Sequence, residues 1–203
     1  MLVPRRRIVR TSVMETADAI NAIPGIESRV YLELGVYAGE TISRIKSRQK
    51  FGVDKIKTCP WTTHTMTTTE FLSSFAIQGM PAPQVVFIDA DHSPEAVAAD
   101  LRGVCDVLAP GGVVFCHDMV PPTEQHVHPG YCNRAYCVLI AALRLGVPCF
   151  SAVSNFGLTC FPTPRPIDVS GEDLMVAWDE LHGRLPPENR LSDADFLARC
   201  RAL

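Results

Sequence analysis

The sequence predicts an α/β protein with a doubly wound, mostly parallel sheet of seven strands, the last of them antiparallel, and helices on both faces. Three observations predict this class. Short apolar runs alternate with helix-like segments, a glycine-rich turn follows the first run, and acidic residues follow two later runs. The predicted strands cover residues 30–34, 51–54, 63–66, 84–89, 112–117, 147–151 and 157–161.

The helix between the fourth and fifth strands has the clearest predicted boundaries. Ser93 is the expected cap, Pro94 suits the first turn, and Pro110-Gly111-Gly112 ends the helix after an apolar stripe. A second helix is expected over residues 134–145, and Gly146 ends it.

Length and composition predict one soluble domain. The 203 residues are 47% hydrophobic and 20% charged, which supports one sizeable core and excludes a disordered chain. We expect an N-terminal arm and helix over residues 1–29, a core over 30–161 and a C-terminal helical extension over 162–203.

Two capping patterns predict helices in the C-terminal extension, where Ser170 precedes Asp173 and Ser192 precedes Asp195. Apolar residues at helical spacing predict that this extension packs against the core, with a homodimer contact as the alternative. These residues are Leu174, Trp178, Leu181 and Leu185.

The charge balance gives no general reason to bind nucleic acid, because 19 Lys and Arg residues face 22 Asp and Glu residues, for a net charge of −3. A basic cluster near the start is expected to be a solvated terminus or to contact an anionic partner; it comprises Arg5, Arg6, Arg7 and Arg10. No apolar run approaches the roughly 20 residues that cross a bilayer, so we expect neither a membrane span nor a removed leader. Eight cysteines without a CxxC pair favour free thiols and a cytoplasmic location.

The most informative segment is Glu33-Leu34-Gly35-Val36-Tyr37-Ala38-Gly39, in which an apolar strand enters a glycine turn and then a helix. Such glycines let a ligand approach the backbone, which indicates a nucleotide-type crevice. The pattern differs from the dinucleotide motif G-x-G-x-x-G, and an ordinary strand-to-helix turn is the alternative. Asp54 ends the next strand, where an acid can bind ribose hydroxyls or simply cap its own loop.

Acidic residues follow the two middle strands. Asp89 and Asp91 close the fourth strand, and His117 and Asp118 close the fifth. In a parallel sheet these side chains converge at one edge, where they can bind a hard cation such as magnesium or serve as helix caps.

These motifs together resemble the class I S-adenosylmethionine-dependent methyltransferases, whose Rossmann-like fold is the one predicted above. The similarity is greatest to the methyltransferase domain 24 family. It rests on the glycine turn, Asp54 and four further segments in order: Phe87-Ile88-Asp89-Ala90-Asp91-His92-Ser93, Asp100-Leu101, Pro110-Gly111-Gly112 and His117-Asp118. Pro94 departs from the pattern, since relatives often have an aromatic residue there.

The resemblance implies a set of site residues. Residues expected to hold S-adenosylmethionine are Glu33, Gly35, Tyr37, Gly39, Thr41, Asp54, Met66, Thr68 and Asp89. Similarity to the catechol-type enzymes implies a magnesium site at Asp89, His117 and Asp118. The position of the general base is occupied by His92, with Asp91 as its rival.

The predicted reaction is methyl transfer from S-adenosylmethionine to a hydroxyl of a small molecule or sugar, with neither nucleic acid nor membrane as partner. The alternatives are a binding module that holds the cofactor without turnover, an NAD-dependent oxidoreductase and an iron-dependent hydroxylase.

The loop over residues 119–132 follows the fifth strand directly, a position from which loops of such sheets select the substrate. Its His126 and His128 are expected to face solvent, with contact to a metal or acceptor as the alternative. Together with Cys132 and Cys137 they match no recognised zinc spacing.

Overall fold

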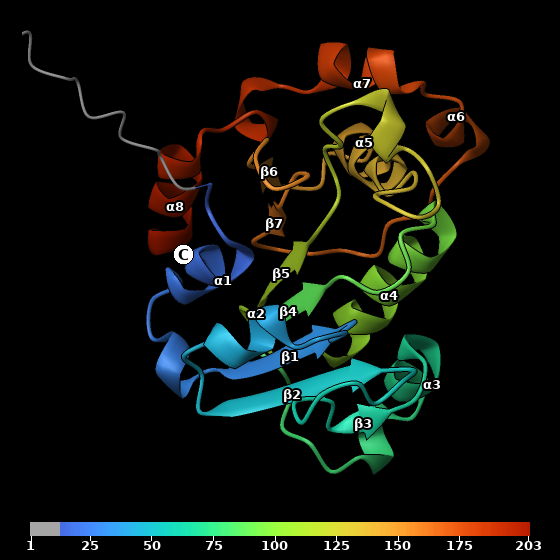
Figure 1. Ribbon diagram of the computed structural model, residues 1–203. Helices are drawn as coiled ribbons and strands as arrows, with labels where there is room; N and C mark the ends of the chain where they lie inside the picture. Colours follow the sequence, from blue (N-terminus) through green and yellow to red (C-terminus); the bar gives the residue numbers. More distant parts are fainter. Residues whose placement is uncertain (1–12) are drawn as a thin grey trace, which may run out of the picture.

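The computed structural model describes residues 13–203 and contains a seven-stranded sheet in the order β3-β2-β1-β4-β5-β7-β6 (Figure 1). The basic cluster of Arg5, Arg6, Arg7 and Arg10 lies outside the described residues. The strands are β1 (Val30–Leu34), β2 (Gln49–Asp54), β3 (His64–Thr65), β4 (Val85–Ile88), β5 (Val113–Cys116), β6 (Phe150–Ser151) and β7 (Thr159–Phe161).

The strand pairing confirms the predicted topology. β1 pairs in parallel with β2 on one side and β4 on the other, while β7 runs antiparallel to both β5 and β6. The order reverses direction between β1 and β4, and in such sheets ligands bind outside the carboxyl ends of the strands at that switch point. β3 and β6 are only two residues long, shorter than their apolar runs predict, because each lies at an edge of the sheet where one neighbour is missing.

The helices cover both faces of the sheet (Figure 1). α1, α2 and α8 lie on one side, and α3, α4 and α5 lie on the other, where α5 also contacts α6 and α7. Their bounds are α1 (Thr16–Asn21), α2 (Glu40–Arg44), α3 (Thr68–Ser73), α4 (Pro94–Val107), α5 (Tyr136–Arg144), α6 (Gly171–Leu174), α7 (Trp178–Arg184) and α8 (Asp193–Arg201).

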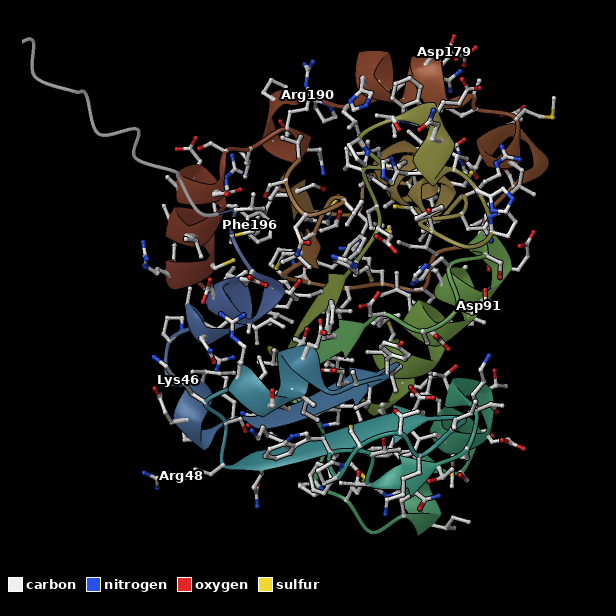
Figure 2. The ribbon with its side chains drawn as sticks, in the orientation of Figure 1. Lys46, Arg48, Asp91, Asp179, Arg190 and Phe196 are labelled. Carbon is white, nitrogen blue, oxygen red and sulfur yellow. The ribbon has the colours of Figure 1, made fainter. Side chains whose placement is uncertain are left out.

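Alternation along β1 explains how one strand serves two layers. Successive side chains of a strand point to opposite faces of the sheet. Tyr31 belongs to the buried cluster beneath α1 and α8, and Leu32 to the cluster beneath α3, α4 and α5. Phe196 of α8 reaches inward to Phe150 of β6, with ring centroids 5.1 Å apart (Figure 2). β4 and β5 are apolar throughout because both of their faces are buried, and β1 departs from this only at the buried Glu33.

The C-terminal extension follows its capping signals. Ser170 and Ser192 each accept a hydrogen bond from the backbone three residues later, so both predicted N-caps are confirmed. The helical stripe is broken, however, because α6 ends at Leu174 and α7 begins only at Trp178. Leu181 and Leu185 are buried in the same cluster as the sheet and α5.

The start of α4 differs from the prediction in one detail. Ser93 occupies the N-cap position, but its hydroxyl makes no capping bond. Instead, Oδ1 of Asp91 accepts a hydrogen bond of 2.8 Å from the Ser93 amide. The predicted helix over residues 134–145 begins two residues later, at Tyr136.

None of the helices formed by residues 13–203 has both the length and the apolar character needed to span a bilayer.

Candidate active site

Gly35 allows the end of β1 to touch the end of β4. Its φ of 88° lies in the left-handed region, and a Cβ there would lie only 2.1 Å from the carbonyl oxygen of Asp89. The Asp89 amide donates to the Leu34 carbonyl at 2.8 Å, which continues the strand pairing up to this contact. Any side chain at position 35 would therefore separate the glycine turn from Asp89.

The turn closes at Gly39, which precedes α2. Gly39 has a φ of 77°, and a Cβ on it would meet Cδ1 of Trp61 at 2.9 Å. Trp61 lies in the loop after β2, so this loop packs against the outside of the turn. Tyr37 has a positive φ of 44° and is 77% exposed, which leaves its side chain in solvent.

The Asp54 side chain, at the end of β2, fixes the glycine turn by hydrogen bonds to its backbone. Its Oδ2 accepts hydrogen bonds from the amides of Val36 at 3.0 Å and Tyr37 at 2.8 Å, and its Oδ1 accepts one from Ile56 at 3.0 Å. The Ile56 bond is the loop cap anticipated as the alternative role. A carboxylate has about four lone-pair directions, so one remains for a ligand hydroxyl.

Glu33 is buried in β1 and accepts a hydrogen bond from the Tyr31 hydroxyl. Burial raises the pKa of Glu33 to about 8, and this outweighs the hydrogen bond from Tyr31, which acts in the opposite direction. The side chain is therefore protonated at neutral pH, and the structure does not bring it to the wall of the cavity described next.

A cavity of about 480 Å³ lies at the carboxyl edge of the sheet, between α1, the start of α2 and the turn that joins β6 to β7. It brings together Thr41 and Asp89 from the predicted cofactor set and His117 from the predicted metal set. Its lining residues are Glu15, Thr16, Ala17, Glu40, Thr41, Arg44, Asp89, His117 and Asn155.

Several lining residues were missed by the sequence analysis. Glu40 directly follows the glycine turn, so its position in the motif was a usable signal. Thr16 and Asn155 carried no such signal, since they lie 139 positions apart and meet through a 3.1 Å hydrogen bond. Conversely, Met66 packs half-buried against the core and Thr68 begins α3, and neither lines the cavity.

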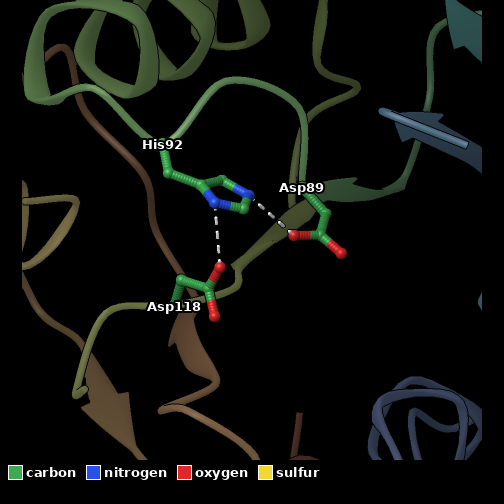
Figure 3. A group of neighbouring side chains, drawn as sticks. All are labelled: Asp89, His92 and Asp118. Atoms are coloured by element: carbon green, nitrogen blue, oxygen red, sulfur yellow. Dashed lines mark hydrogen bonds and ion pairs between the residues drawn. The ribbon is translucent and has the colours of Figure 1, made fainter. Parts of the chain in front are cut away.

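Four titratable side chains meet at the ends of β4 and β5, and Figure 3 shows three of them, Asp89, His92 and Asp118. His92 Nε2 lies 3.3 Å from Asp89 Oδ1, and His92 Nδ1 lies 3.0 Å from Asp118 Oδ2. His117 Nδ1 lies 3.3 Å from Oδ1 of both Asp89 and Asp118. We call these four residues the Asp–His cluster.

The charges of the Asp–His cluster stabilise one another. Burial opposes ionisation of Asp89, but His117 and His92 outweigh it and hold the pKa of Asp89 well below its ordinary value. Burial likewise disfavours charged His92, yet its bonds to Asp89 and the Tyr131 carbonyl, together with Asp118, raise its pKa to about 9. The same balance, with Asp89 as the main partner, raises the pKa of His117. Without a ligand, His92 is therefore protonated at neutral pH.

Asp91 does not join the cluster. It is exposed at the edge of the molecule (Figure 2), and its Oδ1 is engaged by the Ser93 amide. Hydrogen bonds from Ser93 lower its pKa. Of the two predicted bases, the structure places only His92 against Asp89 and Asp118.

The donor set suits a divalent cation. Ligand atoms of Asp89, His92 and Asp118 all lie within 4.8 Å of one another, and within residues 13–203 they form the one group of this kind. The predicted set named His117 in place of His92; its Nδ1 faces the same carboxylates, and its buried Nε2 has no hydrogen-bond partner among the described residues. Two carboxylates bind magnesium well, and an added imidazole also suits transition metals.

The predicted substrate loop packs around aromatic rings. His126 lies with its ring centroid 5.3 Å from Phe156 and 5.6 Å from Tyr131, and its Nδ1 is 2.8 Å from the Thr123 hydroxyl. His128 Nδ1 accepts a hydrogen bond from the Gly130 amide.

Comparisons with known proteins agree with this fold. A family model described as a methyltransferase domain matches residues 47–119, from β2 to the end of β5. An O-methyltransferase from Bacillus cereus, solved with S-adenosylhomocysteine, is 14% identical, with a TM-score of 0.53 over 75% of this chain and 83% of that one. A protein from Corynebacterium glutamicum is 12% identical, with a TM-score of 0.52 over 76% and 83% of the two chains.

A weaker similarity extends to a methyltransferase of mycinamycin biosynthesis, solved with magnesium, S-adenosylhomocysteine and mycinamycin VI. It is 16% identical, with a TM-score of 0.46 over 69% of this chain, and this chain spans 46% of its length. No curated protein matches the sequence. The resemblance to class I methyltransferases is thus confirmed in the fold and, over residues 47–119, in the sequence pattern.

We expect Gly35→Ala to lower the free energy of unfolding by about 2 kcal/mol or more, because the new methyl group meets the Asp89 backbone. Gly111→Ala is the matched control: Gly111 has a similar φ of 73° but no atom within 4 Å of a Cβ, so only the conformational cost of about 1 kcal/mol applies. Denaturant unfolding of both variants measures the difference, and equal losses would contradict the contact.

His92 predicts a pH dependence of stability in metal-free protein. Its folded pKa of about 9 exceeds the unfolded value of about 6.5, so its contribution is full below pH 6.5 and disappears as the pH rises through 9. The gap in unfolding free energy between wild type and His92→Gln should shrink over that range. A gap independent of pH would show that His92 is neutral in the folded protein.

Proposed function

We propose that this protein is an S-adenosylmethionine-dependent methyltransferase acting on a hydroxyl group of a small molecule or sugar. The observation that carries the proposal is the cavity at the switch point of the sheet, where Thr41 from the glycine-turn helix and Asp89 from β4 line the same space. The methyltransferase family match over residues 47–119 supports it, as does the S-adenosylhomocysteine complex of the Bacillus cereus enzyme.

The cavity is chemically suited to the amino-acid end of S-adenosylmethionine. It carries both signs of charge: Glu40 and Oδ2 of Asp89 can contact an ammonium group, and Arg44 can contact a carboxylate in exchange for one of its exposed ion pairs with Glu15 and Asp18. The hydroxyl of Thr41 adds a neutral hydrogen-bonding group. Asp54, which supports the same turn, retains a lone-pair direction for a ribose hydroxyl. When bound, the cofactor supplies an electrophilic methyl group.

Asp89 and Asp118 would hold a divalent cation whose charge stabilises an ionised acceptor hydroxyl, with His117 as the third ligand where His92 serves as the base. His92 Nδ1 faces two acceptors, the Tyr131 carbonyl at 2.7 Å and Asp118, and so keeps its proton. Nε2 faces Asp89 alone. Once Nε2 has lost its proton, it is the atom that accepts the proton of the acceptor hydroxyl, while the Tyr131 carbonyl and Asp118 orient the ring through Nδ1.

A cation beside Asp89 and Asp118 would also compensate the carboxylates that now hold the second proton on His92. The pKa of about 9 makes His92 a poor base in metal-free protein at neutral pH. We infer that cation binding and release of this proton are linked. The exposed Asp91, bonded to Ser93, is the alternative base.

The remaining proposals concern the cellular compartment, the domain organisation and the acceptor of the protein. The eight cysteines are all free thiols, which supports a reducing, cytoplasmic compartment. Helical layers that share one sheet support a single domain with its core over residues 30–161. A small-molecule acceptor agrees with mycinamycin VI in the complex of the mycinamycin methyltransferase.

Cofactor binding is tested by calorimetry. Wild-type protein should bind S-adenosylhomocysteine and not NAD, and Thr41→Phe, which fills the cavity, should weaken that binding at least about tenfold. Ser43→Phe is the matched control, because Ser43 lies on the exposed side of the same helix. Tight NAD binding without binding of S-adenosylhomocysteine would favour an oxidoreductase instead.

Catalysis is tested by following S-adenosylhomocysteine formation over a panel of phenolic, aliphatic and sugar hydroxyl acceptors. Asp89→Asn should lower activity by at least about 10²-fold while calorimetry still detects the cofactor, because a charged positioning group is lost. Asp91→Asn distinguishes the two bases: a comparable loss would assign the base to Asp91 rather than His92. A wild type that binds cofactor but turns over no acceptor would favour a binding module.

A further inference from the structure

Two adjacent residues of the segment before α5 contact two different members of the Asp–His cluster. The carbonyl of Tyr131 accepts a hydrogen bond of 2.7 Å from His92 Nδ1. The thiol of Cys132 donates a hydrogen bond to Asp118 Oδ1 at 3.3 Å. Cys132 is only 2% exposed, and burial, together with the Asp118 carboxylate, raises the pKa of its thiol above the usual range, so the thiol is protonated at neutral pH and available as a donor.

Asp118 needs such support because its backbone leaves the regular strand. Its φ of 62° is in the left-handed region, which is uncommon for a residue other than glycine. The following residues are tied to the turn between β6 and β7: the Met119 amide donates to Gly157 at 2.9 Å and the Val120 amide to Phe156 at 3.1 Å. These bonds place the Asp118 backbone but leave rotation of its carboxylate to side-chain contacts.

Each carboxylate oxygen of Asp118 has its own partners. Oδ1 faces the Cys132 thiol and His117 Nδ1, each at 3.3 Å, whereas Oδ2 faces His92 at 3.0 Å. The Cys132 thiol is an uncharged donor and a poor ligand for magnesium. By occupying Oδ1, it keeps Oδ2 directed toward the interior of the cluster.

The segment that carries Tyr131 and Cys132 is anchored from outside the cluster. The Tyr136 hydroxyl donates to the Val176 carbonyl at 2.8 Å, and Trp178 Nε1 donates to the Pro121 carbonyl at 2.9 Å. The C-terminal extension therefore holds both ends of the loop between β5 and α5, and Cys132 is presented to Asp118 from a supported backbone.

We propose that Cys132 is a positioning residue: its thiol holds Oδ1 of Asp118, so that Oδ2 is directed toward His92 and the space in which a divalent cation would bind. The inference rests on the proposed function, because it assigns Cys132 a role toward the cation of that site. Groups that orient metal ligands in this way typically contribute 10-fold to 100-fold to metal affinity.

The test is a titration with Mn²⁺, followed by the electron paramagnetic resonance signal of free ion, in the absence of cofactor and acceptor. Cys132→Ala should weaken Mn²⁺ binding by at least about tenfold, while Cys132→Ser, which restores a donor, should stay within about threefold of wild type. Cys137→Ala is the matched control, because Cys137 is fully buried at the start of α5 but does not contact Asp118. Circular dichroism verifies that each variant is folded.

A second measurement does not depend on the stability of Cys132→Ala. The infrared S–H stretching band of Cys132 is isolated as the difference between wild type and Cys132→Ser, and should move to higher wavenumber in Asp118→Asn because an amide oxygen is a weaker acceptor than a carboxylate. An unmoved band overturns the inference.

The outcomes separate the inference from the proposed function. Wild type that binds Mn²⁺ together with an unchanged affinity in Cys132→Ala overturns the role of Cys132 and leaves the methyltransferase proposal intact. Wild type that binds S-adenosylhomocysteine but no Mn²⁺ overturns both the cation site and the positioning role. If Cys132→Ala and Cys137→Ala weaken Mn²⁺ binding equally, the positioning role of Cys132 is also overturned, because loss of any buried thiol would then be enough to lower the affinity.

Discussion

The close approach of Gly35 to the backbone of Asp89 is the contact on which the carboxyl edge of the sheet, with its cavity and its Asp–His cluster, depends. A strand that ends in a residue with a side chain could not place its turn against the neighbouring strand, since a Cβ would lie 2.1 Å from the Asp89 carbonyl oxygen. With glycine there, the start of α2 and the end of β4 border one cavity. The Asp54 carboxylate then supports the turn from β2 through two amide bonds.

Charge compensation is the second constraint, and it begins at the same residue. Asp89 contacts both His92 and His117, and Asp118 contacts both as well. Partly buried carboxylates and imidazoles are tolerated here because each charge has an opposite partner. The same arrangement keeps His92 protonated, so its use as a base requires another positive charge to take over the carboxylates. The proposed link between cation binding and release of the His92 proton rests on this electrostatic balance.

The loop between β5 and α5 connects this balance to the rest of the molecule. Within this loop, Tyr131 contacts His92 and Cys132 contacts Asp118. At its two ends, the Pro121 carbonyl accepts a hydrogen bond from Trp178 and the Tyr136 hydroxyl donates one to Val176, and both partners belong to the C-terminal extension. In the same loop, the ring of His126 packs against the rings of Tyr131 and Phe156. Residues that follow the core in sequence thus contribute to the geometry at its centre, although they provide none of the titratable groups of the cluster.

The mostly parallel sheet with its last strand antiparallel, the position of the glycine turn and the convergence of Asp89, His117 and Asp118 followed from the sequence alone. These features depend on local periodicity and on the rule that parallel strands end at one edge of a sheet. Only the tertiary structure decided that His92 rather than Asp91 enters the cluster, that Asp54 bonds to the turn, and that Thr16 and Asn155 meet at the cavity. The orientation of a side chain and contacts between residues far apart in the chain are set by packing of the whole fold, and neighbouring residues in the sequence carry little information about them.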